Sequence, residues 1–241
     1  MTIQAFPDHN VLSQYTAEHV AAHINQKPNA LLCLASGDTP IETYHRFVKL
    51  VEDERVDISQ CQFVGLDEWV GFGPEDAGSC SYYVFRDLFT PLNLRPEQIH
   101  VFDAKADDLA AECARIDALI DERGGLDLLL VGMGMNGHIA LNEPGTPFTL
   151  GCHVVDLAES TKTVGQKYFT QETTLTKGIT LGLRHLTKAH EVVLLVSGEK
   201  KAATLRDALR GPVTEQMPAS ILQNQPNAQI WIDEAAGRLL A

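Results

Sequence analysis

Short, unbroken apolar runs alternate with longer segments of helical period along nearly the whole chain. Apolar runs of this kind are typical of strands in a parallel sheet that is covered on both faces. They occupy residues 30–35, 61–66, 126–131, 191–196 and 228–232. Helices are expected between or after them, over residues 41–51, 80–89, 104–123, 199–209 and 234–240. The alternation predicts an α/β fold with a doubly wound, mostly parallel sheet and helices on both faces.

A single domain over residues 1–241 is expected, although the length alone suits one large domain or two small ones. Hydrophobic residues make up 44% of the chain and charged residues 21%, and no repeat, linker or low-complexity tract divides it. The start shows no signal-peptide pattern, and no apolar run approaches the ~20 residues that span a bilayer. Five scattered cysteines without a C-x-x-C pair are typical of reduced thiols in a cytoplasmic protein, not of a disulfide framework or a zinc site.

The acidic character of the chain limits its partners. A formal net charge of −13 makes nucleic acid and anionic membranes unfavourable as general partners. An anionic small molecule needs a locally positive pocket, because the overall field repels it. The oligomeric state stays open.

The loop after the first predicted strand, residues 36–40 (SGDTP), can bind phosphate. Ligands of parallel α/β sheets bind beyond the carboxyl ends of the strands, and exposed N–H groups at a helix start attract anions. Gly37 permits a tight turn, Thr39 can cap the following helix and Pro40 suits its first turn. The alternative is an ordinary strand-to-helix turn, because both the Walker sequence and the G-x-G-x-x-G dinucleotide fingerprint are missing.

Charged side chains follow two other predicted strands. Asp67 and Glu68 are adjacent after residue 66 and should face opposite ways, so that one can act in a cleft while the other makes structural bonds. A helix cap or a solvated turn is the alternative for this pair. After residue 196, Lys200 is interpreted as solvated, whereas Lys201 near a helix start opposes the helix dipole and indicates an anionic partner.

The loop after residue 131 carries the most informative chemistry. It combines three glycines in six positions with Asn136, His138 and Glu143. A histidine is a general acid or base near neutral pH, and Glu143 is close enough in sequence to orient it. A structural histidine is the alternative. Because no G-x-S-x-G elbow or H-E-x-x-H motif is present, these residues indicate proton transfer on a phosphorylated small molecule without metal or organic cofactor.

Six stretches carry a resemblance to a known family. They are LASGDTP (34–40), FVGLDEWVGF (63–72), VGMGMNGHIALNEPG (131–145), KGITLGL (177–183), VSGEKKA (196–202) and GPVTEQMPASILQ (211–223). In this order they resemble the glucosamine- and galactosamine-6-phosphate deaminase (isomerase) family, within the superfamily that includes the 6-phosphogluconolactonases. The related lactonases resemble G-H-x-A-S-L-F-P where this chain has G-H-I-A-L-N-E-P, which favours the deaminase branch.

The resemblance implies isomerising deamination of a hexosamine 6-phosphate to a ketohexose 6-phosphate and ammonia. His138, assisted by Glu143, would open the sugar ring, and Asp67 would move a proton from C2 to C1. Hydrolysis of the resulting imine would release ammonia. The phosphate would be held by Ser36, Gly37, Asp38, Thr39 and Lys201.

This chain departs from the family pattern at two positions. Asn136 stands where the best-known members have aspartate, and an amide can hydrogen-bond but cannot act as a base. Asp38 stands where a small neutral residue is usual, so its carboxylate should point away from a bound phosphate.

The preferred sugar and the class of activity have alternatives. Trp69, Asn136 and the GGLDL sequence at 124–128 resemble galactosamine-6-phosphate deaminases and favour that substrate slightly over glucosamine 6-phosphate. A 6-phosphogluconolactonase-type hydrolase and a sugar-phosphate sensor without catalysis are the alternatives to a deaminase.

Overall fold

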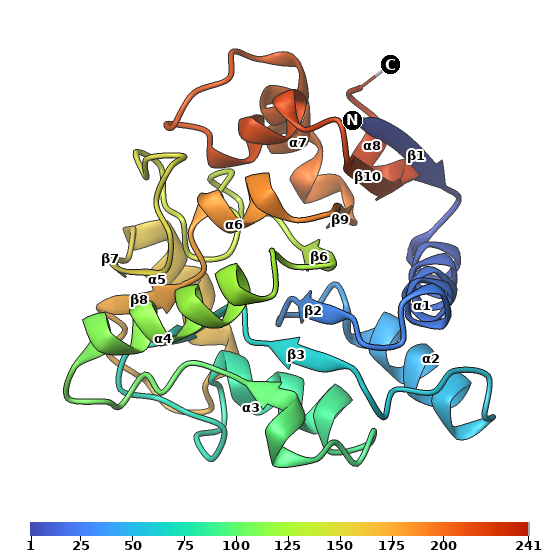
Figure 1. Ribbon diagram of the computed structural model, residues 1–241. Coiled ribbons are helices and arrows are strands. Elements are labelled where there is room, and N and C mark those ends of the chain that lie inside the picture. Colours follow the sequence, from blue (N-terminus) through green and yellow to red (C-terminus); the bar gives the residue numbers. More distant parts are fainter. Residues whose placement is uncertain (241) are drawn as a thin grey trace.

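Seven strands form one sheet in which every pair of neighbours is parallel (Figure 1). The structure is a computed structural model that describes residues 1–240. In sheet order the strands are β1 (Thr2–Phe6), β10 (Ala228–Asp233), β9 (Glu191–Val196), β6 (Leu128–Val131), β2 (Leu31–Leu34), β3 (Gln62–Val64) and β5 (Ile99–His100). The five predicted strands all lie in this sheet, which confirms the doubly wound α/β fold.

Alternation of side chains along the strands creates two apolar cores, one on each face of the sheet. In β2, Leu31 and Cys33 pack into one core, whereas Leu32 and Leu34 pack into the other. One face is covered by α1 (His9–Gln26), α2 (Ile41–Glu52), α3 (Cys80–Val84) and the π-helix η1 (Phe85–Phe89). The other face is covered by α4 (Leu109–Glu122), α6 (Leu183–Lys188), α7 (Ala202–Arg210) and α8 (Glu234–Gly237).

The strand order reverses between β2 and β6. From β2 the chain adds β3 and β5 on one side, and from β6 it adds β9 and β10 on the other, beside the N-terminal strand β1. The loops that leave the carboxyl ends of β2 and β6 therefore diverge and open a crevice, the usual ligand position in such sheets. Both of these loops are predicted site loops.

A second, smaller sheet stands beside this crevice, and the apolar pattern does not predict it. Its three strands are antiparallel: β4 (Asp67–Trp69), β8 (Lys177–Thr180) and β7 (His153–Asp156). The expectation that Asp67 and Glu68 lie in a loop is therefore wrong, because they begin a new strand. Each of these strands has only three or four residues, too few to show a clear period of two.

Several element boundaries also differ from the predicted ones. The sequence pattern does not predict α1, because its buried face includes the small or polar residues Ser13, Thr16, Ala17 and Ala21. The predicted helix 104–123 begins only at Leu109, where the Asp108 side chain accepts hydrogen bonds from the next backbone N–H groups. The remaining short helices are α5 (Glu159–Gly165) and the 3₁₀ helices η2 (Pro96–Gln98), η3 (Gln166–Tyr168), η4 (Glu199–Lys201) and η5 (Pro218–Asn224).

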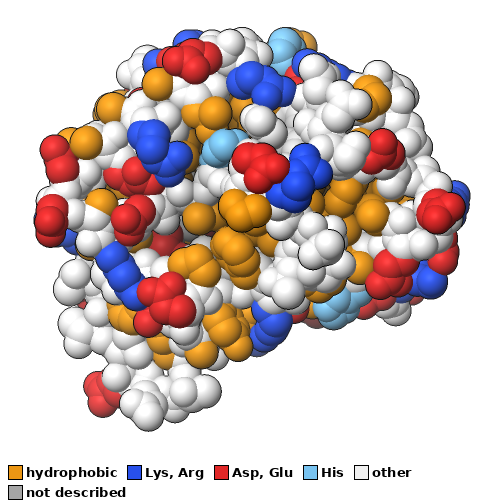
Figure 2. All heavy atoms as spheres, turned by 60° about the horizontal axis from the view of Figure 1, so that its bottom comes forward, with side chains coloured by type: hydrophobic (Ala, Val, Ile, Leu, Met, Phe, Trp, Pro, Cys, Tyr) orange, Lys and Arg blue, Asp and Glu red, His pale blue; other side chains and the backbone are white. Residues whose placement is uncertain are grey.

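The surface mixes charges of both signs. On the face drawn in Figure 2, Lys and Arg side chains lie singly or beside Asp and Glu, with apolar side chains between them. Within residues 1–240, the helices are too short or too polar to cross a membrane. On this face, positive charge for an anionic ligand therefore comes from single side chains and not from a broad basic patch.

Candidate active site

The residues predicted for the site come together at the β2/β6 crevice. Ser36 follows β2, and its hydroxyl lies 3.5 Å from a carboxylate oxygen of Asp67. Lys201 ends η4, the short helix that follows β9, and donates to the backbone carbonyl of Met133, in the loop after β6. The loops after β2, β6 and β9 and the start of β4 thus surround one region.

Asp67 and Glu68 have different surroundings. Glu68 is 1% exposed and accepts backbone hydrogen bonds from Trp69, Cys80 and Ser81 at 2.8–2.9 Å. The Ser81 hydroxyl donates to it as well. With four donors bound, Glu68 ties β4 to the start of α3 and has no free oxygen lone pair directed to a substrate. Asp67 is partly exposed at the crevice.

The environment of Asp67 raises its proton affinity. Burial raises the pKa of Asp67 to about 6, and the nearby charge of Glu68 adds to the rise. The Cys80 and Ser36 side chains and the charge of His138 act in the opposite direction. Ser36, Asp67 and Cys80 line the same small cavity. A carboxyl group with a pKa near the working pH can both accept and return a proton within one catalytic cycle.

We expect kcat/KM to fall as the pH drops below about 6, because protonation removes the base form of Asp67. The measurement is the pH profile of kcat/KM for the wild type and for Ser36→Ala. The phosphate group of the free substrate also titrates near pH 6, but the part of the profile that it causes would be the same for wild type and variant, because kcat/KM reports the free enzyme and the free substrate. Loss of the Ser36 hydrogen bond should raise the pKa of Asp67 and so shift the acidic fall of kcat/KM to higher pH. If the fall stays at the same pH in Ser36→Ala, it belongs to the substrate and not to Asp67.

His138, Glu143 and Asn136 form a connected group in the loop after β6. Nδ1 of His138 lies 3.4 Å from Glu143 Oε2 and 3.3 Å from the hydroxyl of Thr161 in α5. Asn136 donates its amide to the same Glu143 oxygen at 2.8 Å, and its carbonyl oxygen accepts from the His138 backbone at 3.2 Å. Burial alone would raise the pKa of Glu143, but hydrogen bonds from His138, Thr161 and Asn136 lower it to about 2.

This arrangement decides which ring nitrogen of His138 is available. An ionised Glu143 beside Nδ1 favours a proton on that nitrogen, which leaves Nε2 to exchange protons with a ligand. Nε2 makes no hydrogen bond within the described residues. Gly134 packs so close to this edge of the imidazole that a Cβ atom there would overlap Nε2. Only glycine at residue 134 therefore allows the ring to lie in this position.

Two lysines lie near residues 36–40, the loop that is predicted to bind phosphate and is called the phosphate loop below. Lys201 is partly buried, and burial, followed by the nearby charge of Lys167, lowers its pKa. Lys167 in η3 bonds Asp38 at 2.7 Å. Gly37 has a φ of +101°, which suits glycine, and its backbone lies beside the Tyr168 hydroxyl.

Residue 39 does not have the predicted capping role. Pro40 occupies the position before α2, and no side chain caps this helix. The Thr39 carbonyl accepts a hydrogen bond from the His9 ring at 2.8 Å, so α1 holds this turn in place. The cap expected from Thr39 is wrong because the turn continues through Pro40 before the helix begins.

Three residues of the site are missing from the sequence-based prediction: Thr161, Lys167 and Cys80. Thr161 and Lys167 come from the α5–η3 segment, which does not follow a strand of the main sheet and so falls outside a search of strand ends. Cys80 reaches Asp67 only because α3 packs against β4. No local sequence signal marks these three, since their role depends on tertiary contacts.

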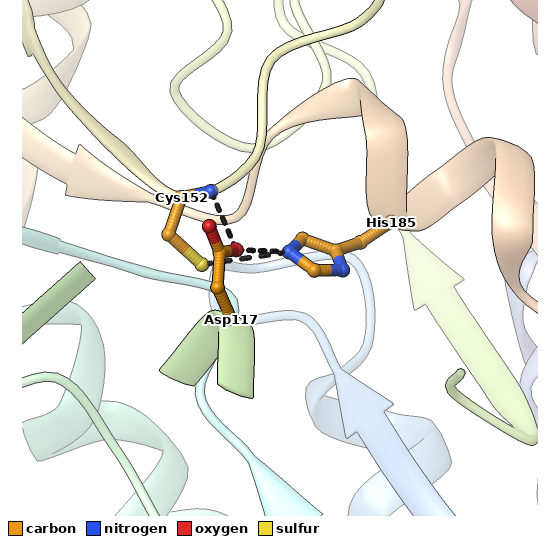
Figure 3. A group of neighbouring side chains, drawn as sticks. All are labelled: Asp117, Cys152 and His185. Atoms are coloured by element: carbon orange, nitrogen blue, oxygen red, sulfur yellow. Dashed lines mark hydrogen bonds and ion pairs between the residues drawn. The ribbon is translucent and has the colours of Figure 1, made fainter. Parts of the chain in front are cut away.

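A separate cluster of possible metal ligands lies away from the crevice, where Asp117 of α4, Cys152 before β7 and His185 of α6 point toward one another (Figure 3). His185 Nε2 lies 2.5 Å from Asp117 Oδ1 and 3.7 Å from Cys152 Sγ. The same Asp117 oxygen accepts from the Cys152 backbone and lies 3.2 Å from Arg184.

The donor atoms of this cluster already satisfy one another. His185 Nδ1 is buried without a partner, which favours the tautomer whose Nε2–H donates to Asp117. A metal on Nε2 would instead leave a buried Nδ1–H unpaired. Burial, followed by Asp117, also raises the pKa of the Cys152 thiol, which keeps it protonated. We interpret the cluster as a structural hydrogen-bond network that joins α4, α6 and β7.

The crevice can therefore carry out acid–base chemistry on an anionic ligand. It offers a carboxyl group with a raised pKa at Asp67, an imidazole oriented by Glu143, and lysines at residues 167 and 201. A ligand with a phosphate at one end could place its reacting carbon atoms near Asp67 and His138.

Comparison with known proteins shows the family of this chain. A family model described as glucosamine-6-phosphate isomerases/6-phosphogluconolactonase matches residues 9–231. A glucosamine-6-phosphate deaminase from Lachnoclostridium phytofermentans is 40% identical over 220 residues, which cover 91% of this chain and 93% of the relative. A solved monomeric glucosamine-6-phosphate deaminase has a TM-score of 0.95 at 35% identity and covers 99% of this chain and 100% of its own. A 6-phosphogluconolactonase from Thermotoga maritima, at 18% identity, a TM-score of 0.75 and coverage of 96% and 98%, shows the shared fold alone. The chain therefore belongs to the glucosamine-6-phosphate isomerase/6-phosphogluconolactonase family.

Proposed function

We propose that this protein catalyses the isomerising deamination of a hexosamine 6-phosphate to a ketohexose 6-phosphate and ammonia. The observation that carries the proposal is the pairing of a raised-pKa carboxyl group, Asp67, with the His138–Glu143 pair in one crevice beside two lysines. The family contains both deaminases and lactonases, and a lactonase needs no base at C2. The partly exposed Asp67 beside His138 favours a deaminase.

Ring opening is the proposed task of His138. The free Nε2 would take the proton of the C1 hydroxyl and then return it to the ring oxygen as the bond between C1 and that oxygen breaks, which gives the open-chain aldehyde. The positive charge that forms on the imidazole is stabilised by the ionised Glu143. Asn136 holds the same carboxylate oxygen and so helps to orient the pair without acting as a base.

Isomerisation is the proposed task of Asp67. Its carboxylate would remove the proton from C2, so that the electron pair of this bond forms the C1–C2 double bond of an enolamine while the C1 oxygen takes a proton from solvent. The resulting acid would then deliver its proton to C1, and the nitrogen lone pair forms the C2–nitrogen double bond of a protonated imine. Water adds to this imine, and ammonia leaves as the C2 ketone forms. No step requires an external oxidant or reductant, because the aldehyde carbon is reduced while C2 is oxidised.

The choice between sugars depends on a hydroxyl group at C4. We favour galactosamine 6-phosphate slightly, because of Trp69, Asn136 and residues 124–128. The test is an ammonia assay with galactosamine 6-phosphate and glucosamine 6-phosphate side by side. Release of ammonia from either sugar supports the function, and the ratio of kcat/KM identifies the preferred one. Hydrolysis of 6-phosphogluconolactone without ammonia release from either sugar would show a lactonase instead of a deaminase. Binding of a sugar phosphate without turnover would indicate a sensor.

We expect Lys201→Ala to raise KM by about tenfold to a hundredfold, the range of a lost hydrogen bond to a charged group. The lysine is partly buried beside another cation, so its removal should lower the melting temperature little. Steady-state kinetics and thermal melts measure the two effects. Lys200→Ala is the matched control, since Lys200 is an exposed neighbour. An unchanged KM together with a sharply lower melting temperature would make Lys201 structural.

A further inference from the structure

Lys201 lacks a carboxylate partner in the described part of the chain. Its ammonium group donates to the Met133 carbonyl, while burial and the charge of Lys167 both act against its charged form. A cation in such a place is stabilised when an anion joins it. A phosphate group that binds between the two lysines therefore gains the most favourable electrostatic interaction energy.

Lys167 already has an anion. Its ammonium lies 2.7 Å from Asp38 Oδ2 and 4.6 Å from the centre of the Tyr168 ring. Although burial lowers the pKa of Lys167, the hydrogen bond to Asp38 raises it overall. The pair joins residues that are 129 positions apart and links the α5–η3 segment to the phosphate loop.

Contacts around the pair show that the segment rests on the loop. The Tyr168 hydroxyl lies beside the Gly37 backbone, and the Tyr168 carbonyl accepts from the Tyr83 hydroxyl at 3.1 Å. The Asp38 side chain is itself 65% exposed, so it can rotate into solvent without loss of packing. The Lys167 side chain is 49% exposed, and its ammonium also lies over the Tyr168 ring, so the ion pair can open by rotation of Asp38 while Lys167 keeps its contact with Tyr168.

From these contacts we propose that Asp38 is an internal competitor for the substrate phosphate: its carboxylate holds Lys167 in the empty site and must release it when phosphate binds. The proposal rests on the proposed function for the identity of the ligand, but its chemistry requires only a phosphate group. Asp38 occupies one of two cationic positions, and a phosphate dianion is attracted to both. Binding therefore includes the cost of breaking one ion pair.

The expected effect is a gain in affinity when the competitor is removed. Asp38→Asn keeps the size of the side chain and removes its charge, so Lys167 becomes free for phosphate. Because exposed ion pairs are weak, the Kd for phosphate should fall by about twofold to fivefold. The KM for a hexosamine 6-phosphate should fall in the same proportion.

The chain offers a matched control for the change in net charge. Glu159 in α5 pairs with Lys162 at 2.6 Å and is 88% exposed, and this pair lies in the same segment. Glu159→Gln removes one negative charge as Asp38→Asn does, without touching the phosphate loop. It should leave the phosphate Kd within the error of the wild type.

The experiment is calorimetric titration of the whole protein with inorganic phosphate and with glucose 6-phosphate, which has no amino group to lose. The variants are Asp38→Asn, Asp38→Ser, Glu159→Gln, Lys167→Gln and the double variant Asp38→Asn/Lys167→Gln, each checked for folding by thermal melting. We expect tighter binding in both Asp38 single variants, and loss of this gain once Lys167 is replaced. Direct repulsion between Asp38 and phosphate would instead preserve the gain in the double variant.

Three results would overturn the proposal: a gain of equal size in the double variant, no gain in either Asp38 variant, or no binding of phosphate by the wild type. Its failure can be told apart from failure of the proposed function. If the wild type releases ammonia but Asp38→Asn binds phosphate no more tightly, only the competitor role of Asp38 is rejected. If Asp38→Asn binds phosphate more tightly but no hexosamine 6-phosphate releases ammonia, only the deaminase function is rejected.

Discussion

Replacing Asp67 with asparagine should lower turnover by roughly a hundredfold or more, the range expected for loss of a general base. Asparagine keeps the shape of the side chain but cannot accept a proton from C2. Substrate should still bind, because removal of a carboxylate near an anionic ligand reduces repulsion. Ammonia release under saturating substrate measures turnover, and NMR in heavy water measures exchange of the C2 proton, which should be abolished.

Glu68→Gln is the matched control for this variant, since it neutralises the adjacent carboxylate. The NH₂ group of glutamine must replace one carboxylate oxygen, and it would then face the backbone N–H groups of Trp69 and Cys80 or that of Ser81, which now donate to Glu68. The melting temperature should therefore fall, while folded protein retains C2 exchange. Normal exchange in Asp67→Asn together with none in a folded Glu68→Gln would reverse the assignment of the two carboxylates.

His138→Gln should also lower turnover of the cyclic substrate by roughly a hundredfold or more. Glutamine can hydrogen-bond Glu143 but cannot move a proton between the C1 hydroxyl and the ring oxygen. Ring opening also occurs slowly in water, so the variant should become limited by the supply of open-chain sugar. The measurement is the time course of turnover at high enzyme concentration. A fast initial burst should consume the open-chain fraction of the substrate, and a slow phase set by ring opening in water should follow.

His190→Gln is the control for the loss of a histidine, because His190 is exposed and lies before the amino end of β9, at the edge opposite the crevice. It should keep wild-type turnover. If His138→Gln retained most of its activity, His138 would be removed from the mechanism, and the Glu143–Asn136 pair would need another role.

The main sheet could be predicted because its strands are buried on both faces. Runs such as residues 191–196 are apolar at almost every position, and this pattern needs no tertiary information. The edge strand β1 has four exposed residues of five, so it lacks the signal. The small sheet also lacks an apolar signal, since β4 consists of Asp67, Glu68 and Trp69. Its pairing with β8 joins residues more than a hundred positions apart, so it cannot be read from the local sequence.

The site could be predicted in part for a related reason. Ser36, His138 and Lys201 follow strands of the main sheet, and parallel strands bring their carboxyl ends to one edge. Lys167 and Thr161 reach that edge from the α5–η3 segment, whose position depends on the small sheet. The expectation that the Asp38 carboxylate points away from a bound phosphate stays a prediction, and its ion pair with Lys167 could not be inferred from spacing.

The central claim is that ammonia is lost through isomerisation, and deuterium at C2 of the substrate tests it most directly. With hexosamine 6-phosphate labelled at C2, NMR of the product should show a 2-ketose, with the deuterium at C1 or in the solvent. Asp67→Asn should leave the label in unreacted substrate. Ammonia release with deuterium still bonded to C2 of the product would contradict the account, because it would require loss of nitrogen without removal of the C2 proton.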